Sequence, residues 1–293
     1  MSAIAAKPGA NAGAFQPIPS VIAIVLAIVL VILAYFLGNA GILAGGALFV
    51  LQTLCLIILG TVLIAFGVHF VPVGGAPAAM GQAPGIATGV AMLATGAGLA
   101  GLFGGAWAAE TFGTALDGGL WLSLIGGAIG GGLMMAITCL MVNISYVFGM
   151  GIPPASGKVE KDPITKYPQA AYKSQGTEGH GLPFVSYIGG VIGGLFGGLG
   201  GTLIYVELLD FYNAALPALF TAGDVSGLSV GLAGIFAVGM FLVIAVLSAY
   251  NITGTIEGPH DPKFKRFPRA IIAAILAGAI CGIVALLVVA VFI

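Results

Sequence analysis

The sequence predicts an all-α polytopic membrane protein with seven transmembrane helices, and two observations support this prediction. Charged residues make up 6% of the 293 residues and hydrophobic residues 59%, whereas a soluble domain carries about 25% charge. The few charges are also clustered, so that long stretches contain none; these are residues 8–109, 118–157, 179–206, 225–256 and 270–293. Each stretch can hold at least one span of about 20 apolar residues.

Gly, Pro and Asn residues divide these stretches into seven apolar segments. The segments are residues 20–37, 41–67, 85–107, 119–149, 184–207, 228–250 and 270–292. The polar residues 1–19 form a tail, and residues 20–293 form a single transmembrane domain. Between the first two segments, residues 38–40 leave room only for a tight antiparallel turn.

The basic residues predict the orientation, because Lys and Arg resist translocation. With seven spans, one side of the membrane holds the N-terminus and the inner loops 68–84, 150–183 and 251–269, which together contain all 9 Lys and Arg residues. The other side holds acids and no base; they are Glu110, Asp117, Glu207, Asp210 and Asp224. We therefore expect a cytoplasmic N-terminus and a C-terminus outside the cell.

The chain also contains an internal repeat. After the fourth segment it reads Asn-Ile-Ser from Asn143 and Asp-Pro from Asp162, and after the sixth it reads Asn-Ile-Thr from Asn251 and Asp-Pro from Asp261. We interpret segments two to seven as three helical hairpins closed on the inner side, with the first segment appended. Repeats of this kind often place a site at their interface.

Glycines recur at every fourth position of the fifth segment, which predicts a helix face without side chains that a neighbouring backbone approaches closely. The residues of this face are Gly189, Gly193, Gly197 and Gly201, and Gly126, Gly127, Gly130 and Gly131 form a second such face. A close helix crossing is the favoured interpretation. A path lined by backbone is the alternative.

No Asp, Glu, Lys or Arg lies at the centre of a predicted span, although ion-coupled membrane proteins usually carry a buried ionisable group on the ion path. Glu110, Glu207 and Asp210 are expected at outer helix ends, in contact with water. Thr138, Asn143 and Asn251 offer neutral oxygens to a hard cation such as sodium. Helix hydrogen bonding explains these three residues equally well.

Each predicted inner loop contains one histidine, namely His69, His180 or His260. With Glu178 and Glu257 nearby in sequence, the three imidazoles could converge as a metal site of the kind that suits zinc. Helix capping or a partner interface is the alternative. The candidates for an ion path or its inner mouth are therefore His69, Asn143, Glu178, His180, Asn251 and Glu257, with no catalytic residue assigned.

Composition argues against nucleic-acid binding, and the cysteine pattern argues against a disulfide framework or a four-thiolate zinc site. A net charge of −1 without a basic stripe argues against nucleic-acid binding. The three cysteines, Cys55, Cys139 and Cys281, lie in separate apolar runs without C-x-x-C spacing, so we interpret them as packing residues.

Three strings of the sequence resemble a known family. They are His69-Phe-Val-Pro-Val-Gly-Gly-Ala-Pro-Ala-Ala-Met80, Gly151-Ile-Pro-Pro-Ala-Ser-Gly-Lys-Val-Glu-Lys-Asp-Pro-Ile-Thr165 and Thr177-Glu-Gly-His-Gly-Leu-Pro183. Together with the glycine-rich helix that follows, they resemble the MtrD family, whose members are membrane subunits of the sodium-translocating tetrahydromethanopterin S-methyltransferase of methanogenic archaea. The similarity spans roughly residues 45–293, and the first 40 residues look like an extension.

The resemblance implies a subunit of a multisubunit complex in the cell membrane. Such a complex moves a methyl group from methyl-tetrahydromethanopterin, through a corrinoid on another subunit, to the thiol of coenzyme M, and couples this transfer to sodium export. This chain is then expected to bind no cofactor firmly. Its share would be ion passage, docking of the corrinoid subunit or part of the coenzyme M site, where Lys158, Lys161, Lys166 and Arg266 of the inner loops could meet an anionic group. An independent secondary transporter and a scaffold without its own site are the alternatives.

Overall fold

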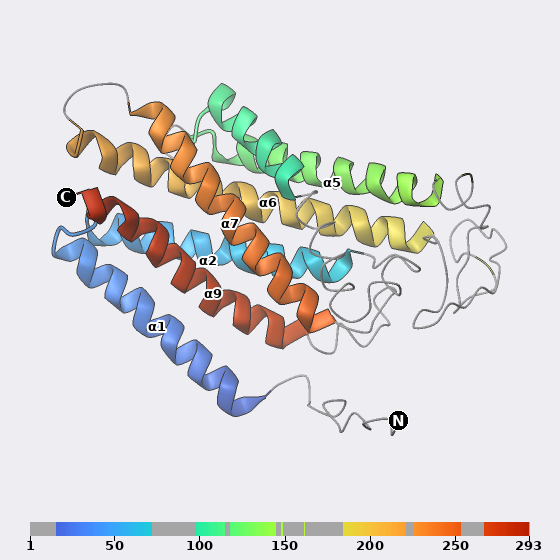
Figure 1. Cartoon of the computed structure of the whole chain (residues 1–293), viewed down its shortest axis with the longest axis horizontal. Helices are drawn as coiled ribbons and strands as arrows, with labels where there is room; N and C mark the ends of the chain where they lie inside the picture. The colour runs from blue at the N-terminus through green and yellow to red at the C-terminus, as the bar shows by residue number, and fades with distance from the viewer. Residues whose placement is uncertain are drawn as a thin grey trace, which may run out of the picture.

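The computed structural model describes residues 16–71, 98–114, 118–144, 148, 161, 184–220, 225–252 and 267–292. Long α-helices dominate this part of the chain (Figure 1). They are α1 (Pro17–Asn39), α2 (Gly46–Phe70), α5 (Leu120–Ile144), α6 (Phe184–Ala215), α7 (Ser226–Ile252) and α9 (Phe267–Leu287). A further helical segment covers residues 98–112, and the 3₁₀ turns η2 (Leu216–Ala218) and η3 (Val288–Phe292) follow α6 and α9.

The six labelled α-helices are all long and apolar enough to cross a membrane. The prediction of an all-helical, multi-pass protein is therefore confirmed at this level. The helix at residues 98–112 overlaps the third predicted segment, whose residues 85–97 lie outside the described part of the chain.

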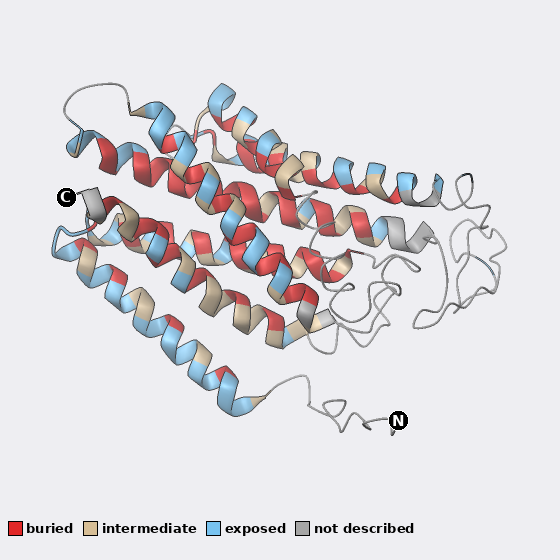
Figure 2. Cartoon of the chain, viewed as in Figure 1, coloured by how far each residue is buried: buried red, intermediate tan, exposed pale blue. Residues whose placement is uncertain are grey.

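Helix α6 lies at the centre of the bundle and contacts α2, α5 and α7. Residues 201–212 are all buried, whichever side of the helix they occupy. A helix that is apolar all round is expected to be surrounded by other helices, and Figure 2 shows α6 largely buried and α1 largely exposed. The apolar side chains that α1 exposes are suited to lipid or to a partner subunit.

The fifth predicted segment ends too early at residue 207, because α6 continues to Ala215. Apolar residues resume directly after Glu207 and again after Asp210, and the first proline beyond them is Pro217. Two acids within an apolar run therefore do not interrupt the helix. The consequence is that both carboxylates lie inside the bundle.

The turn between α1 and α2 is longer than the three residues predicted for it. It covers residues 40–45, with Gly41 and Gly45 at φ of 74° and 84°. These left-handed conformations favour glycine. The turn still brings the helices together, because a Cβ placed on Gly38 would lie 2.9 Å from Cα of Ala47.

Helices α2, α5 and α7 run in one direction along the bundle, and α1, α6 and α9 run in the opposite direction (Figure 1). The ends of α2, α5 and α7 and the beginnings of α6 and α9 lie toward one end of the molecule, on the right in this view. The C-terminal end of α9 lies at the opposite end. Both repeated Asn-Ile pairs fall at helix ends of the same side, since α5 ends at Ile144 and α7 at Ile252.

Candidate functional site

Glycines bring the backbones of α2 and α6 into close contact at two levels. A Cβ on Gly67 would lie 2.6 Å from the carbonyl oxygen of Gly193, and a Cβ on Gly60 would lie 2.8 Å from that of Gly200. Real Cβ atoms do not come this close to backbone, so only glycine fits at these crossings. The register of the two helices is thereby fixed.

The opposite side of α6 packs in the same way against α5. Cβ atoms on Gly127 and Gly131 would collide with Gly198 and Gly194 of α6. The second predicted glycine face also meets the helix at residues 98–112, where a Cβ on Gly126 would lie 2.9 Å from the carbonyl oxygen of Gly104. Around these contacts, Thr202 donates a hydrogen bond to the carbonyl oxygen of Gly101 over 3.3 Å.

The four predicted glycines of α6 are not equally confined. A Cβ on Gly193 would lie 2.6 Å from the carbonyl oxygen of Gly67, and one on Gly189 would lie 2.9 Å from that of Phe70. On Gly201 it would lie 3.1 Å from the ring of Phe241, and on Gly197 no closer than 3.5 Å. The crossing with α2 therefore depends most directly on Gly193.

Two of the candidate inner-mouth residues, His69 and Asn251, lie in contact. His69, at the end of α2, is fully buried, and its Nδ1 lies 2.6 Å from the carbonyl oxygen of Ala65. A carbonyl only accepts, so Nδ1 carries the proton and Nε2 of the neutral ring accepts. Nδ2 of Asn251, at the end of α7, donates to this Nε2 over 3.2 Å.

Aromatic side chains from three helices, α2, α6 and α9, gather beside this contact. The ring of Phe267, at the start of α9, packs edge-on against His69 and against Phe66, with centroid distances of 5.2 and 5.3 Å. Phe66 also packs against Phe196 of α6 at 4.7 Å. The cluster closes the bundle at the end where the predicted inner loops begin.

The structure does not describe the side chains of the remaining inner-mouth candidates. Glu178, His180, Glu257 and His260 lie outside the described residues, and the side chain of Asn143 is not described. The structure thus leaves the three-histidine metal site as a prediction. Within the described residues, no three His, Cys, Asp or Glu side chains form a group that could hold a metal.

The expectation that Glu207 and Asp210 contact water is wrong. Both residues are 3% exposed and lie within the apolar stretch 188–218 of α6. Oε1 of Glu207 has no hydrogen-bond partner. Glu110, in contrast, is exposed at the end of the helix 98–112, as expected. The sequence does contain the signal for the two buried acids, because the residues that follow them as far as Phe220 are mostly hydrophobic.

Cys55, Cys139 and Cys281 carry free thiols on three different helices. Cys139 is buried, and Cys281 packs against the hydrophobic core. The sequence analysis gives Thr138 as a candidate oxygen ligand for a cation. In the structure its hydroxyl donates a hydrogen bond to the carbonyl oxygen of Met134 in its own helix over 2.8 Å.

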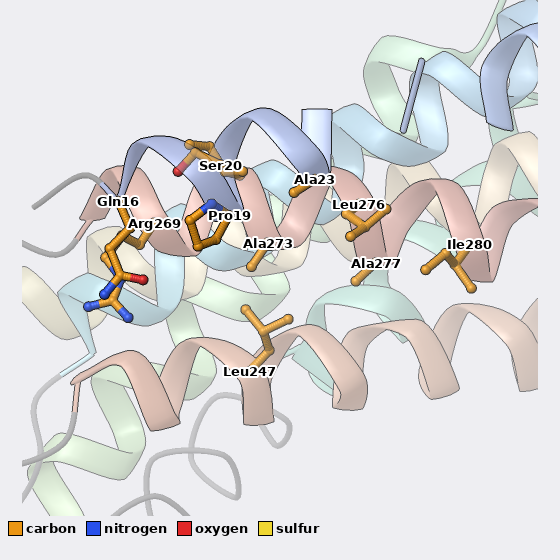
Figure 3. A pocket seen from close by; sticks show the side chains of 11 residues that line it. Gln16, Pro19, Ser20, Ala23, Leu247, Arg269, Ala273, Leu276, Ala277 and Ile280 are labelled. Atoms are coloured by element: carbon orange, nitrogen blue, oxygen red, sulfur yellow. The ribbon is translucent and has the colours of Figure 1, made fainter. Parts of the chain in front are cut away.

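A groove of about 360 Å³ lies between α1, α7 and α9 (Figure 3). Its walls are mostly apolar and include Ala23, Leu247 and Ile280, while Gln16 and Arg269 lie at one end. None of the candidate inner-mouth residues lines it. The candidate site therefore consists of the buried acids of α6 and the His69–Asn251 contact, not of this groove.

Comparison with known proteins identifies the family. Residues 50–278 match the MtrD family model, which describes one subunit of tetrahydromethanopterin S-methyltransferase. The chain is 50% identical over 239 residues to this subunit from Methanosarcina barkeri, covering 81% of the chain and 94% of the relative. It is 51% identical over 224 residues to that from Methanothermobacter marburgensis, covering 76% and 90%, and 46% identical over 235 residues to that from Methanopyrus kandleri, covering 80% and 95%.

The family match begins after α1, which supports the view of this helix as an addition to the common pattern. The remaining helices, with the glycine crossings, the buried acids and the His69–Asn251 contact, fall within the matched residues or close to their ends. The chain belongs to the MtrD family and is a subunit of the tetrahydromethanopterin S-methyltransferase of archaeal methanogenesis.

Proposed function

We propose that this subunit forms part of the sodium path of a methyltransferase complex that exports sodium while it methylates coenzyme M. The methyl group comes from methyl-tetrahydromethanopterin and passes through a corrinoid on another subunit. One observation supports the proposal above all: the carboxylate of Glu207 is 3% exposed within an apolar, membrane-spanning helix. An ionisable group at such a place indicates a functional site, and an ion pathway is one of the roles that such groups serve.

The energetic argument concerns the cost of burying a carboxylate. An isolated charge in an apolar interior is strongly disfavoured unless a counter-charge or a coordinated ion accompanies it. A helix that served only as a scaffold would carry Leu or Phe at position 207, like its neighbours Val206 and Leu208. Asp210 lies one turn further along the same helix and places a second carboxyl group near the first. Sodium provides the missing positive charge in this proposal.

The membrane topology in this proposal is the one that the sequence predicts. The third predicted segment, residues 85–107, adds a span to the six long helices, so that segments two to seven make three hairpins closed on the cytoplasmic side, with the N-terminus in the cytoplasm and the C-terminus outside. The gathering of the relevant helix ends at one end of the bundle supports this arrangement (Figure 1). The inner loops then face the corrinoid subunit, and their basic residues suit an acidic partner surface.

The His69–Asn251 contact lies at the cytoplasmic end in this topology and forms the inner mouth of the subunit. It joins α2 to α7 through neutral groups, which carry no charge that would hold an ion there. In this proposal the corrinoid and the methyl transfer from the pterin belong to other subunits, whereas this chain contributes the membrane passage, a docking surface and part of the coenzyme M site.

The proposal is tested with the purified complex reconstituted into liposomes. Uptake of radioactive sodium and methylation of coenzyme M are measured together for the wild type, Glu207→Gln and the exposed-site control Glu110→Gln. Glu207→Gln should abolish sodium uptake, while Glu110→Gln should keep it. Normal sodium uptake by an assembled Glu207→Gln complex would contradict the proposal and favour a scaffold role for this subunit.

A further inference from the structure

We propose that the hydroxyl of Thr53 on α2 and the carboxylate of Glu207 on α6 are two of the ligands of one sodium ion bound between these two helices. This inference rests on the proposed function and names the ligands of the ion. Thr53 does not stand out in the sequence pattern, and Glu207 was expected in water.

The helix register places the two residues opposite each other. Gly60 and Gly200 are in contact, since a Cβ on Gly200 would lie 2.5 Å from the carbonyl oxygen of Gly60. Thr53 comes seven residues before Gly60, and Glu207 comes seven residues after Gly200. Seven residues are close to two turns, or about 10 Å, of an α-helix. Because α2 and α6 are antiparallel, both side chains start from the facing surfaces at the same level.

A second contact, beyond this level, confirms the register. Phe49 of α2 lies four residues before Thr53, and Phe211 of α6 lies four residues after Glu207. Each phenylalanine is therefore about one helical turn further from the Gly60–Gly200 contact. Their rings stack with a centroid distance of 6.2 Å and an interplanar angle of 18°. Thr53 and Glu207 therefore lie between two fixed contacts, with glycine backbone on one side and an aromatic pair on the other.

Both side chains have a buried oxygen without a hydrogen-bond partner. They are Oγ1 of Thr53, on a residue that is fully buried, and Oε1 of Glu207. Nearly all buried polar atoms in proteins have a partner, so two orphans at one level of one interface require an explanation. The other buried threonine of α2, Thr61, has its hydroxyl bonded to the carbonyl oxygens of Ile58 and Ala274.

A hard cation satisfies both oxygens at once. A threonine hydroxyl and a carboxylate offer lone pairs of the kind that Na⁺, Mg²⁺ and Ca²⁺ prefer. Of the two proposed ligands only Glu207 carries a charge, so a monovalent ion leaves this pair without excess charge, which is costly to bury. The site also lies on α2, the helix whose other end carries His69, so a single rigid element connects it to the proposed inner mouth.

Sodium binding by the detergent-solubilised complex tests the inference. The thermal stability of the complex is measured as NaCl replaces choline chloride at constant ionic strength, because a ligand that binds the folded form raises the melting temperature. Thr53→Val removes the hydroxyl at nearly constant volume, Thr53→Ser keeps it, and Thr61→Val is the matched control on the same helix. Binding of ²²Na⁺ to the same samples gives an independent readout.

Thr53→Val should raise the sodium concentration for half-saturation by about tenfold or more, a loss of the size that even indirect partners of metal sites cause. Thr53→Ser and Thr61→Val should keep the wild-type value, although Thr61→Val lowers the melting temperature at every sodium concentration. An unchanged half-saturation in Thr53→Val would overturn the inference. If Glu207→Gln still abolished sodium transport in that case, the proposed function would stand without this site.

Discussion

Asn251 donates a hydrogen bond to His69 over 3.2 Å and so connects the ends of two helices that are far apart in sequence. The same imidazole donates to the carbonyl oxygen of Ala65 one turn earlier in its own helix. Both ring nitrogens of His69 are engaged by these two bonds. The contact therefore holds α7 against the end of α2 and also fixes which nitrogen of the ring carries the proton.

This relationship predicts strong coupling between substitutions at the two positions. His69→Phe and Asn251→Leu should each lower the thermal stability of the purified complex, because the first leaves the half-buried amide of Asn251 and the second the buried imidazole of His69 without this bond. In the double variant no such partner remains from this bond, so the combined loss should be smaller than the sum by on the order of 1 kcal/mol. The four melting curves of a double-mutant cycle measure this difference. Additive losses would show that the bond contributes no coupling.

The packing of α6 predicts different outcomes for two glycines that the sequence pattern treats alike. Gly193→Ala should reduce the amount of assembled complex, since the added Cβ would lie 2.6 Å from the carbonyl oxygen of Gly67. Gly197→Ala should be tolerated, because its Cβ would meet only the Phe241 ring at 3.5 Å. Blue-native electrophoresis of the two variants measures assembly. Equal yields would show that α2 moves to accommodate the extra methyl group.

Apolar length predicted most of the fold because the bilayer requires it. Runs of about 20 apolar residues bounded by Gly, Pro or charge form helices in lipid, where every backbone polar group must be bonded within the segment. The rule fails at Glu207, because the charge predicts the end of a span there, whereas α6 continues to Ala215. Only the packing of neighbouring helices over residues 201–212 decides whether such a carboxylate reaches water.

The candidate site was less accessible to sequence reasoning, because its contacts cross between helices. The internal repeat identified Asn251, and the occurrence of one histidine in each predicted inner loop identified His69. No local pattern indicates that these two side chains, 182 positions apart in the chain, lie only 3.2 Å from each other. Thr53 carries no signal of its own. Its interest depends on the Gly60–Gly200 contact, which sets its level against Glu207.

The proposed topology predicts which residues are reached from each side of the membrane. Single cysteines at residues 160 and 263, in a variant without Cys55, Cys139 and Cys281, should react with a membrane-impermeant maleimide only in inverted vesicles. Cysteines at residues 115 and 220 should react only from the outside, because an odd number of spans separates them from the inner loops. Labelling of residues 160 and 263 from opposite sides would exclude the three inner-closed hairpins.

The last prediction concerns His180, which the sequence places beside Glu178 before the glycine-rich helix α6. A metal held by histidines at the inner mouth would favour the thiolate form of coenzyme M, which is the form that attacks a methyl group. His180→Ala should then slow methyl transfer from the methyl-corrinoid to coenzyme M and leave methylation of the corrinoid and assembly of the complex unchanged. The two half-reactions are measured separately, together with the zinc content.

His69 is the informative comparison, because it must release Asn251 before its Nε2 can bind a metal. We expect His69→Gln to keep the zinc content of the wild type, whereas a parallel loss of zinc in both variants would show that the histidines share one ion. Equal rates of both half-reactions in His180→Ala and the wild type would leave His180 with a capping or interface role.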